Sequence, residues 1–232
     1  HYRDASLRGY KLLSKNGFLN TNSDNEIQSI LEPNKKGVRK IPGVKIQNSK
    51  TGEVIYTPPE GQEIILDKLK NFEEYFNNHQ DFDNIDPLIR MAVMHYQFEA
   101  IHPFLDGNGR TVRILMILYL VMVGRLDLPI LFLSKYILEN RDKYYSLLSA
   151  VTNKAEWKAW IMYILQAVDQ QAQETRLGII KIKQLIEEYK KMKLGVITPQ
   201  LIDYLFSNPF YSKKNLAESL NIHRNTTSKY FN

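Results

Sequence analysis

The strongest constraint in this 232-residue sequence is an uninterrupted apolar run, residues 114–123, which Gly124 ends. These ten residues fall well short of the roughly 20 that a membrane-spanning helix needs. An element that is apolar all round has to be covered by others in a folded domain. We predict a buried helix over residues 111–123 at the centre of one main domain, with a small second module, since domains most often run to about 100–150 residues.

The rest of the chain carries mostly helical patterns. Apolar residues recur at helical spacing in residues 2–14, 26–31, 64–76, 86–101, 139–151, 157–168 and 179–192. Residues 44–47 and 53–56 instead alternate around the turn-forming residues 48–52, which indicates a β-hairpin. The predicted fold class is therefore mostly α with one hairpin.

Composition narrows the setting of the protein. The absence of cysteine excludes disulfides, thiolate zinc sites and cysteine nucleophiles, and it favours a reducing, cytoplasmic compartment. The net charge is +6, and residues 178–232 hold nine Lys or Arg against four Asp or Glu. A basic tail is typical either of a solvated helix surface or of a nucleic-acid contact. The first residues have a helical pattern without a capping residue, so we expect the natural protein to begin further upstream.

Residues 102–113 place a titratable base, a carboxylate, two glycines and two arginines at the mouth of the apolar helix. Pro103 disfavours helical geometry in the residue before it, and Gly107 and Gly109 enclose a tight loop around Asn108. Small residues before a helix let backbone N–H groups point into a concavity, and the positive end of the helix adds to their attraction for an anion. The pattern predicts a polyphosphate site.

The charged residues of the loop fit the same interpretation. Asp106 would repel a polyphosphate unless a hard cation such as Mg²⁺ bridges the two. Arg110 and Arg113 are three apart on the new helix and can fork onto phosphate oxygens. His102 stands just before the loop, where it can remove a proton from a hydroxyl that approaches phosphorus.

Other interpretations exist for each element alone. His102 can be a structural histidine, the glycines a plain turn and the arginines a solvated face. A metal trio of His95, His102 and Asp106 is disfavoured, because Pro103 and the glycines lie among these residues and no fourth donor is apparent. The combination of all elements within twelve residues favours the phosphate site.

This loop resembles the Fic family signature H-x-F-x-[D/E]-G-N-G-R-x-x-R without exception. The matching residues are His102, Phe104, Asp106, Gly107, Asn108, Gly109, Arg110 and Arg113. Residues 95–100 are similar to the helix that precedes the family loop, and the stretch from Gly43 to Pro59 is similar to its hairpin flap. The resemblance implies a Fic-type helical core with a β-hairpin flap.

The resemblance also implies an activity, protein adenylylation. His102 would deprotonate a Ser, Thr or Tyr hydroxyl of a target protein, or of the chain itself, for attack on the α-phosphorus of ATP. Asp106 would hold Mg²⁺, and Gly107, Asn108 and Gly109 would form the anion hole. Arg110 would steady the phosphate chain and Arg113 would take the γ-phosphate. Phe104 would point inward and anchor the loop.

Further parts of the resemblance concern ligands. Tyr145, the second tyrosine of residues 140–145, would line the base pocket, whereas an asparagine common in relatives is replaced by Thr152. The flap would receive the target as an added strand, although covering the core is an alternative role. The inhibitory [S/T]-x-x-x-E-[G/N] motif of many relatives is missing from these residues, which implies a free Arg113.

The end of the chain resembles a truncated winged-helix or helix-turn-helix unit. We expect helices at 201–206, at 213–220 with Ser212 as cap, and from near His223 onward. The basic residues Lys213, Lys214, Arg224 and Lys229 suit DNA phosphates, although the unit can also serve target docking or a homo-oligomer. The expected domains are N-terminal helices at 1–34, a catalytic domain at 35–168, a helical linker at 169–195 and the partial winged helix at 196–232.

Three rival functions stay open. Kinase-type relatives transfer the γ-phosphate, but they usually carry lysine where this chain has Gly109. Removal of AMP from a modified protein would use the same loop with an inhibitory glutamate. A DNA-binding transcriptional regulator whose Fic domain only senses nucleotide is the alternative of another class.

Overall fold

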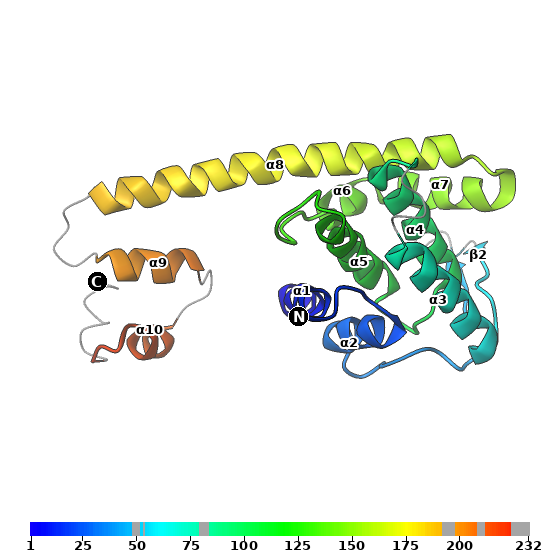
Figure 1. Ribbon diagram of the computed structural model, residues 1–232, viewed down its shortest axis with the longest axis horizontal. Coiled ribbons are helices and arrows are strands. Elements are labelled where there is room, and N and C mark those ends of the chain that lie inside the picture. Colours follow the sequence, from blue (N-terminus) through cyan, green and yellow to red (C-terminus); the bar gives the residue numbers. More distant parts are fainter. Residues whose placement is uncertain (48–51, 53, 79–83, 192–197, 208–211, 224–232) are drawn as a thin grey trace. The chain divides into compact units, whose positions relative to one another are not determined.

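The structure is a computed structural model that describes residues 1–47, 52, 54–78, 84–191, 198–207 and 212–223 (Figure 1). The chain divides into two compact units, residues 1–172 and residues 173–232, and each is described by itself. The predicted fold class, mostly helical with one small hairpin, is confirmed. Within the described residues, no helix combines the length and apolar character needed to cross a bilayer.

The predicted buried helix is the centre of the first unit. Helix α5 (Asn108–Met122) lies among α1 (Tyr2–Asn16), α2 (Thr21–Leu31) and α4 (Pro87–Ile101), and its residues 114–120 are at most 3% exposed (Figure 1). Side chains that point in all directions from α5 therefore meet other helices. Burial of this kind contributes about 1.5–3 kcal/mol for each large apolar side chain.

Close packing at Gly9 joins α1 to both α2 and α5. A Cβ atom at this position would lie 2.6 Å from Leu118 Cδ1 and 2.9 Å from Ile27 Cδ1. The three helices approach at a point where only a hydrogen fits. The N-terminal helices therefore belong to the same core as α5.

The remaining helices of the first unit are α3 (Gln62–Asn77), α6 (Ser134–Glu139), α7 (Arg141–Lys154) and the first half of α8 (Trp157–Lys191). Helix α8 is continuous where the sequence pattern indicated two helices, because no proline interrupts it and Gly178 has no neighbour that forces a bend. The predicted helix 139–151 is wrong in its start, since Asn140 separates α6 from α7.

The predicted hairpin is present but short. Strand β1 (Ile46–Gln47) pairs antiparallel with β2 (Val54–Tyr56), with Ile46 opposite Tyr56 and a bulge before the next pair. Its predicted turn, residues 48–51, and Glu53 lie outside the described residues. Helix α7 contacts β2, so the hairpin lies over the C-terminal half of the unit.

Local signals set the two helix ends that face each other across the candidate loop. Helix α4 begins where Asp86 accepts a hydrogen bond from Leu88 N (2.8 Å), and it ends at His102, which is left-handed with φ 47° before Pro103. Helix α5 starts at Asn108, after Gly107 with φ 84°, three residues earlier than the sequence pattern indicated. Asn108, Gly109 and Arg110 therefore form the first turn of α5.

The second unit contains α9 (Pro199–Ser207) and α10 (Lys213–Leu220) after the end of α8. Ser212 caps α10 as predicted, accepting a hydrogen bond from Asn215 N at 3.2 Å, and Leu201, Ile202 and Leu216 are buried. The expected third helix falls almost entirely outside the described residues, as do Arg224 and Lys229. The winged helix and its DNA contacts stay predictions.

Candidate active site

A cavity of about 340 Å³ lies at the end of α4 and the start of α5. Its walls come from the loop between these helices, from α6 and α7, and from Ile46 of the hairpin. All eight site residues chosen from the sequence line it: His102, Asp106, Gly107, Asn108, Gly109, Arg110, Arg113 and Tyr145. The structure therefore brings together residues that the sequence separates by up to 43 positions.

The backbone around His102 is held by Arg39, a buried residue for which the sequence predicted no role. Arg39 Nε donates to the His102 carbonyl (2.8 Å), and Arg39 Nη2 donates to the carbonyls of Pro59 (2.5 Å) and Ile101 (3.5 Å). Its own N–H donates to the Pro103 carbonyl (2.8 Å). One guanidinium with planar, fixed donors thus orients the backbone that carries the imidazole.

Beneath the imidazole lies a buried carboxylate, Glu99, one turn earlier on α4. Its Oε2 is 3.6 Å from His102 Nδ1, which is a charge-pairing distance rather than a hydrogen bond. Burial raises the pKa of Glu99, but His102, His95 and Arg113 lower it, and the net pKa lies below the ordinary value. Glu99 is therefore ionised at neutral pH and faces the ring of His102.

His95, which lies four residues before Glu99 on α4, is also buried. Its Nε2 lies 2.9 Å from the Tyr144 hydroxyl, and its ring meets those of Tyr144 and Trp160 edge-on. Burial lowers the pKa of His95 to about 4, so the ring is neutral at neutral pH. His95 is thus held in the core by Tyr144 and Trp160.

The side chain of Asn108 closes the loop upon itself. Asn108 Oδ1 accepts from Phe104 N (2.9 Å) and Asn108 Nδ2 donates to the Phe104 carbonyl (2.8 Å), while Phe104 is fully buried. Phe104 thus points inward as predicted. The first intrahelical bond of α5, from Thr111 N to the Gly107 carbonyl, leaves the N–H groups of Asn108, Gly109 and Arg110 without helical acceptors.

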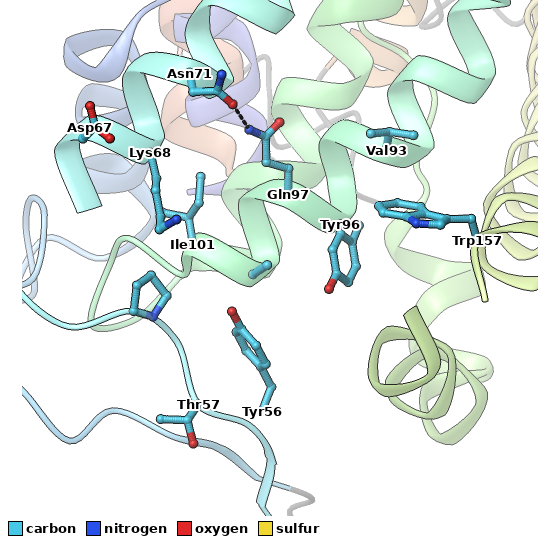
Figure 2. A pocket seen from close by; sticks show the side chains of 12 residues that line it. Tyr56, Thr57, Asp67, Lys68, Asn71, Val93, Tyr96, Gln97, Ile101 and Trp157 are labelled. Carbon is cyan, nitrogen blue, oxygen red and sulfur yellow. Dashed lines mark hydrogen bonds between the residues drawn. The ribbon is translucent and has the colours of Figure 1, made fainter. Parts of the chain in front are cut away.

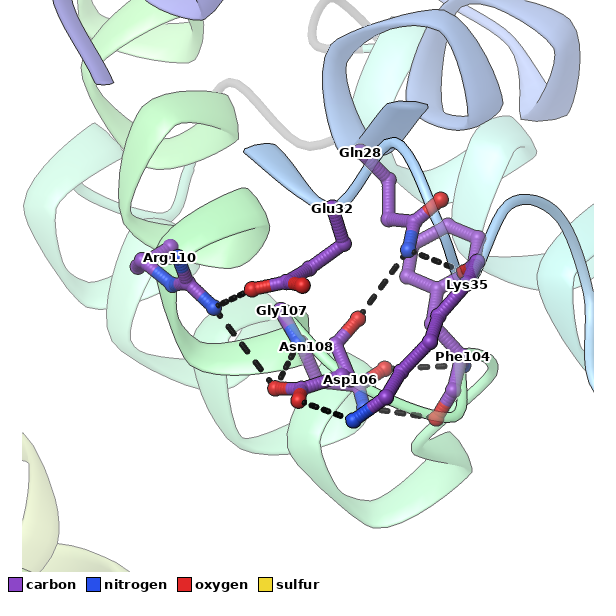
Figure 3. A network of polar contacts seen from close by, with 8 residues as sticks. All are labelled: Gln28, Glu32, Lys35, Phe104, Asp106, Gly107, Asn108 and Arg110. Carbon is purple, nitrogen blue, oxygen red and sulfur yellow. Dashed lines mark hydrogen bonds and ion pairs between the residues drawn. The ribbon is translucent and has the colours of Figure 1, made fainter. Parts of the chain in front are cut away.

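A second amide, that of Gln28, joins the loop to the segment that follows α2 (Figure 3). Gln28 Nε2 donates to the carbonyls of Asp106 (3.1 Å) and Lys35 (2.8 Å), and its Oε1 accepts from Gly37 N (3.2 Å). Gln28 is fully buried. Buried amides that satisfy both donor and acceptor specify one backbone geometry.

Four charges alternate in sign along the mouth of the cavity (Figure 3). Glu32 pairs with Arg110 Nη2, and the same nitrogen lies 3.6 Å from Asp106 Oδ1. The other carboxylate oxygen of Asp106, Oδ2, pairs with Lys35 Nζ at 2.8 Å. The hydrogen bond from Lys35 lowers the pKa of Asp106, with a further contribution from the Gly107 N–H. Asp106 is therefore ionised and already paired with cationic groups.

Arg113 differs from Arg110 in its partners. Its Nε donates to Ser134 Oγ (2.8 Å), and no carboxylate of the described residues lies within ion-pair distance. A Cβ at Gly109 would come within 3.0 Å of Arg113 Nη1 and 3.2 Å of Glu99 Oε1. Glycine at this position keeps room for both groups under the first turn of α5.

The far wall of the cavity carries aromatic and apolar groups. Tyr145 lies beneath the Arg141 guanidinium, whose Cζ is 5.4 Å from the ring centroid. Leu138 and Leu105, both exposed, also line the cavity. Thr152 is directed elsewhere, because its Oγ1 lies 2.9 Å from the Tyr96 hydroxyl and it does not line this cavity.

Five residues of the site had not been assigned a role from the sequence. Gln28, Glu32, Lys35 and Arg39 are 63 to 78 positions from their partners in the loop, and no local pattern marks such pairs. Glu99 had a usable signal. It lies three residues before His102, which is the spacing that brings side chains together on a helix.

Comparisons with known proteins agree with this architecture. The Fic/DOC family model matches residues 23–120. Protein adenylyltransferase fic-1 from Caenorhabditis elegans is 30% identical over 168 residues, 69% of this chain and 30% of that protein. Protein adenylyltransferase Fic from Aedes aegypti is 29% identical over 171 residues, 72% of this chain and 31% of that protein. The chain thus spans about a third of the length of these curated relatives.

Solved structures show the same fold. A fragment of Fic-1 from C. elegans has a TM-score of 0.57 and 25% identity, over 78% of this chain and 51% of that one. A Fic family protein from Desulfovibrio desulfuricans G20 has a TM-score of 0.59 over 99% of this chain and 65% of that one, and at 19% identity it shows the fold alone. Residues 23–120 therefore form a Fic domain of the Fic/DOC family.

Proposed function

We propose that this chain is a protein adenylyltransferase, which transfers AMP from ATP to a Ser, Thr or Tyr hydroxyl of a target protein or of itself. The observation that carries the proposal is the single cavity in which His102, Asp106, the first turn of α5 and Arg113 converge. The names of the relatives support the same reaction class. A general base, an anion site and arginines are the groups that phosphoryl and nucleotidyl transfer requires.

The proposed reaction uses His102 as general base. The imidazole takes the proton of the target hydroxyl as its oxygen forms a bond to the α-phosphorus of ATP. The bond between the α-phosphorus and the bridging oxygen to the β-phosphate breaks, and pyrophosphate leaves with the electron pair. Glu99, 3.6 Å from Nδ1, stabilises the imidazolium that forms.

The phosphates are assigned to the start of α5. The N–H groups of Asn108, Gly109 and Arg110 lack helical acceptors, and the helix dipole favours an anion there. Arg110 can keep Glu32 with one N–H and offer others to a phosphate, because a guanidinium has five donors. Arg113, without a carboxylate partner among the described residues, is placed at the γ-phosphate, and Tyr145 at the adenine.

The site fits Mg²⁺ only as a companion of the nucleotide. Among the described residues no cluster of three metal-binding side chains is present, whereas Asp106 offers an ionised carboxylate at the cavity mouth. Mg²⁺ commonly uses one or two carboxylates and completes its shell with phosphates and water. Bound there, the cation would neutralise charge on the phosphates, and Asp106 would have to exchange Lys35 for it.

The hairpin is proposed as the place where the target chain lies. Its two strands leave edge backbone groups available, and Ile46 lines the catalytic cavity. A target segment that adds a strand there would pass His102.

The test follows two labels. The protein is incubated with a candidate target or alone, with ATP labelled at either the α- or the γ-phosphate, and protein-bound label is counted. Label from α-ATP only is the expected result. Label from γ-ATP would indicate a phosphotransferase, loss of AMP from a pre-modified protein would indicate the reverse reaction, and no label from either would favour a nucleotide-sensing regulator.

A further inference from the structure

A second cavity, of about 710 Å³, lies between α3, α4 and the segment after β2 (Figure 2). Its volume is about twice that of the catalytic cavity and falls in the usual range of roughly 300–1,000 Å³ for ligand sites. It is lined by residues of β2 and the segment after it, of α3 and α4, and by Trp157 at the start of α8.

This cavity and the catalytic cavity flank the same last turns of α4. Val93, Gln97 and Ala100 follow helical spacing along one face, whereas Glu99 and His102 lie about half a turn away. A small cavity of about 20 Å³ under the hairpin shares Tyr56, Tyr96 and Ala100 with the larger one and Ile46 and Glu99 with the catalytic one. The two cavities are therefore neighbours that both border the space under the hairpin.

One end of the larger cavity is aromatic. Figure 2 shows Tyr56, Tyr96 and Trp157 around it, and the rings of Tyr96 and Trp157 meet edge-to-face with centroids 5.0 Å apart. The Tyr96 hydroxyl is already bonded to Thr152, which fixes the ring. Rigid aromatic walls of this kind accept another ring at little entropic cost.

The other end carries one cation, Lys68, and the neighbouring carboxylate residue Asp67 also lines it. Lys68 is exposed and has no ion-pair partner among the residues that the structure describes, and Figure 2 shows its ammonium directed toward the cavity. Behind it, Asn71 and Gln97 bind each other through Gln97 Nε2 and Asn71 Oδ1 (2.9 Å). An unpaired ammonium beside an apolar wall favours a ligand with a carboxylate next to an apolar group.

We propose that this cavity is a docking subsite for the target polypeptide, which places an aromatic side chain against Tyr56, Tyr96 and Trp157 and a neighbouring carboxylate at Lys68. The inference rests on the proposed AMP transfer. A helix with its side chains is about 10–12 Å across, and an extended chain advances about 3.3 Å per residue. The aromatic residue therefore lies three or four positions from the modified hydroxyl.

The first test measures sequence preference. Peptide pools with a central Ser, Thr or Tyr, in which one flanking position at a time is Phe, Glu, Lys or Ala, are incubated with α-labelled ATP. Wild type should prefer Phe and Glu three or four positions from the centre. Lys68→Glu should reverse the Glu-over-Lys preference about tenfold, and Lys70→Glu, the same charge change on α3 outside the cavity, should behave as wild type.

The second test needs no transfer. The chain has two tryptophans, of which Trp160 is fully buried and Trp157 lines the cavity, so fluorescence reports on its occupation. A capped Phe-Glu peptide should change the emission of wild type and Lys70→Glu at concentrations about tenfold lower than for Lys68→Glu; a Phe-Lys peptide should show the opposite order. Trp157→Phe should remove the signal.

The outcomes separate the two proposals. Peptide binding that depends on Lys68 without any AMP transfer would keep the subsite and overturn the proposed function. AMP transfer with no flanking preference, and equal fluorescence titrations for Lys68→Glu and Lys70→Glu, would overturn the subsite and keep the function.

Discussion

The loop between α4 and α5 and the hairpin of β1 and β2 face the same cavity, yet they are held very differently. The loop is tied to distant parts of the chain by Arg39 and Gln28 and to itself by Asn108. The hairpin has only two and three residues in its strands, and Val54 is 43% exposed. Hydrogen bonds to several parts of the chain fix the loop. The described residues of the hairpin form only a short ladder with each other.

The difference matches what each element has to do. Nucleotidyl transfer requires a base and an anion site at fixed distances, and misplacement by about 1 Å can cost a hundredfold in rate. A surface that receives another polypeptide needs free backbone groups and tolerance of several side chains. We therefore expect substitutions in the loop to change kcat and stability, and substitutions in the hairpin to change KM.

The largest effect is expected at the base. His102→Ala should lower kcat for AMP transfer about 10²–10⁴-fold, because the target hydroxyl loses its proton acceptor. ATP binding, measured by calorimetry, should stay within about threefold of wild type, since the phosphate contacts are on α5. Transfer at the wild-type rate would show that His102 is not the base.

The second-largest effect is expected at Arg39, whose guanidinium holds the backbone of the loop. Arg39→Met keeps apolar bulk but leaves the carbonyls of residues 59, 101 and 102, which are buried or partly buried, without this donor. We expect a loss of about 3–5 kcal/mol in the free energy of unfolding, measured in urea, and at least a tenfold lower kcat in the folded protein. Lys40→Met, an exposed neighbour, is the control. Equal stability of the two variants would mean that the hydrogen bonds of Arg39 do not stabilise the fold.

The buried His95 of α4 should also make the free energy of unfolding depend on pH. The pKa of His95 is about 4 in the folded protein, against the ordinary value of 6.5 expected after unfolding. Between these values the unfolded chain binds a proton that the folded chain does not, so the free energy of unfolding falls as the pH drops from 6.5 to 4, by up to about 3 kcal/mol.

Comparison with His95→Gln isolates the contribution of His95 to the pH dependence of the free energy of unfolding. Urea midpoints are measured for both proteins between pH 7 and pH 4.5. The difference between wild type and variant should be constant above pH 6.5 and should change steadily below it. Two parallel curves would show that His95 does not carry the dependence.

At the mouth of the cavity a smaller effect is expected. Lys35→Ala removes the cation that pairs with Asp106, so the Mg²⁺ concentration needed for half-maximal ATP binding should fall about two- to fivefold. Lys36→Ala, an exposed neighbour, should leave it unchanged. A higher Mg²⁺ requirement in Lys35→Ala would mean that Lys35 helps to hold the nucleotide.

The smallest change in stability is expected on the hairpin. Ile46→Ala should raise KM for the protein target about two- to fivefold and alter kcat little, with a loss of at most about 1 kcal/mol in the free energy of unfolding because Ile46 is only partly buried. Ile41→Ala, 60% exposed and outside the cavity, is the matched control. A fall in kcat with KM unchanged would place Ile46 with the loop.

The sequence predicted those parts of the fold that depend on neighbouring residues. Asp86 and Pro87 marked the start of α4, Pro103 its end, and Ser212 the start of α10, because caps and proline act within one turn. The start of α5 was missed by three residues, since Gly107 adopts its left-handed conformation next to Glu32 and Gln28, far away in the chain.

The site shows the same division. A contiguous motif carried seven of the eight lining residues, and Tyr145 came from residues 140–145. The partners that fix the positions of the loop residues come from the segment around α2. Arg39 and Gln28 look like ordinary polar residues until the chain folds and buries them. A single sequence does not record contacts of this range, so the roles of such residues follow only from the structure.

The left-handed backbone of His102 decides how a substrate-trapping variant should be made. With φ 47°, this position disfavours alanine, which has no polar side chain to hydrogen-bond locally, whereas asparagine adopts the left-handed region far more readily. His102→Asn should therefore leave the α4 terminus and the Arg39 contacts undisturbed while abolishing proton removal. A target protein would bind to the unchanged surface of this variant without receiving AMP.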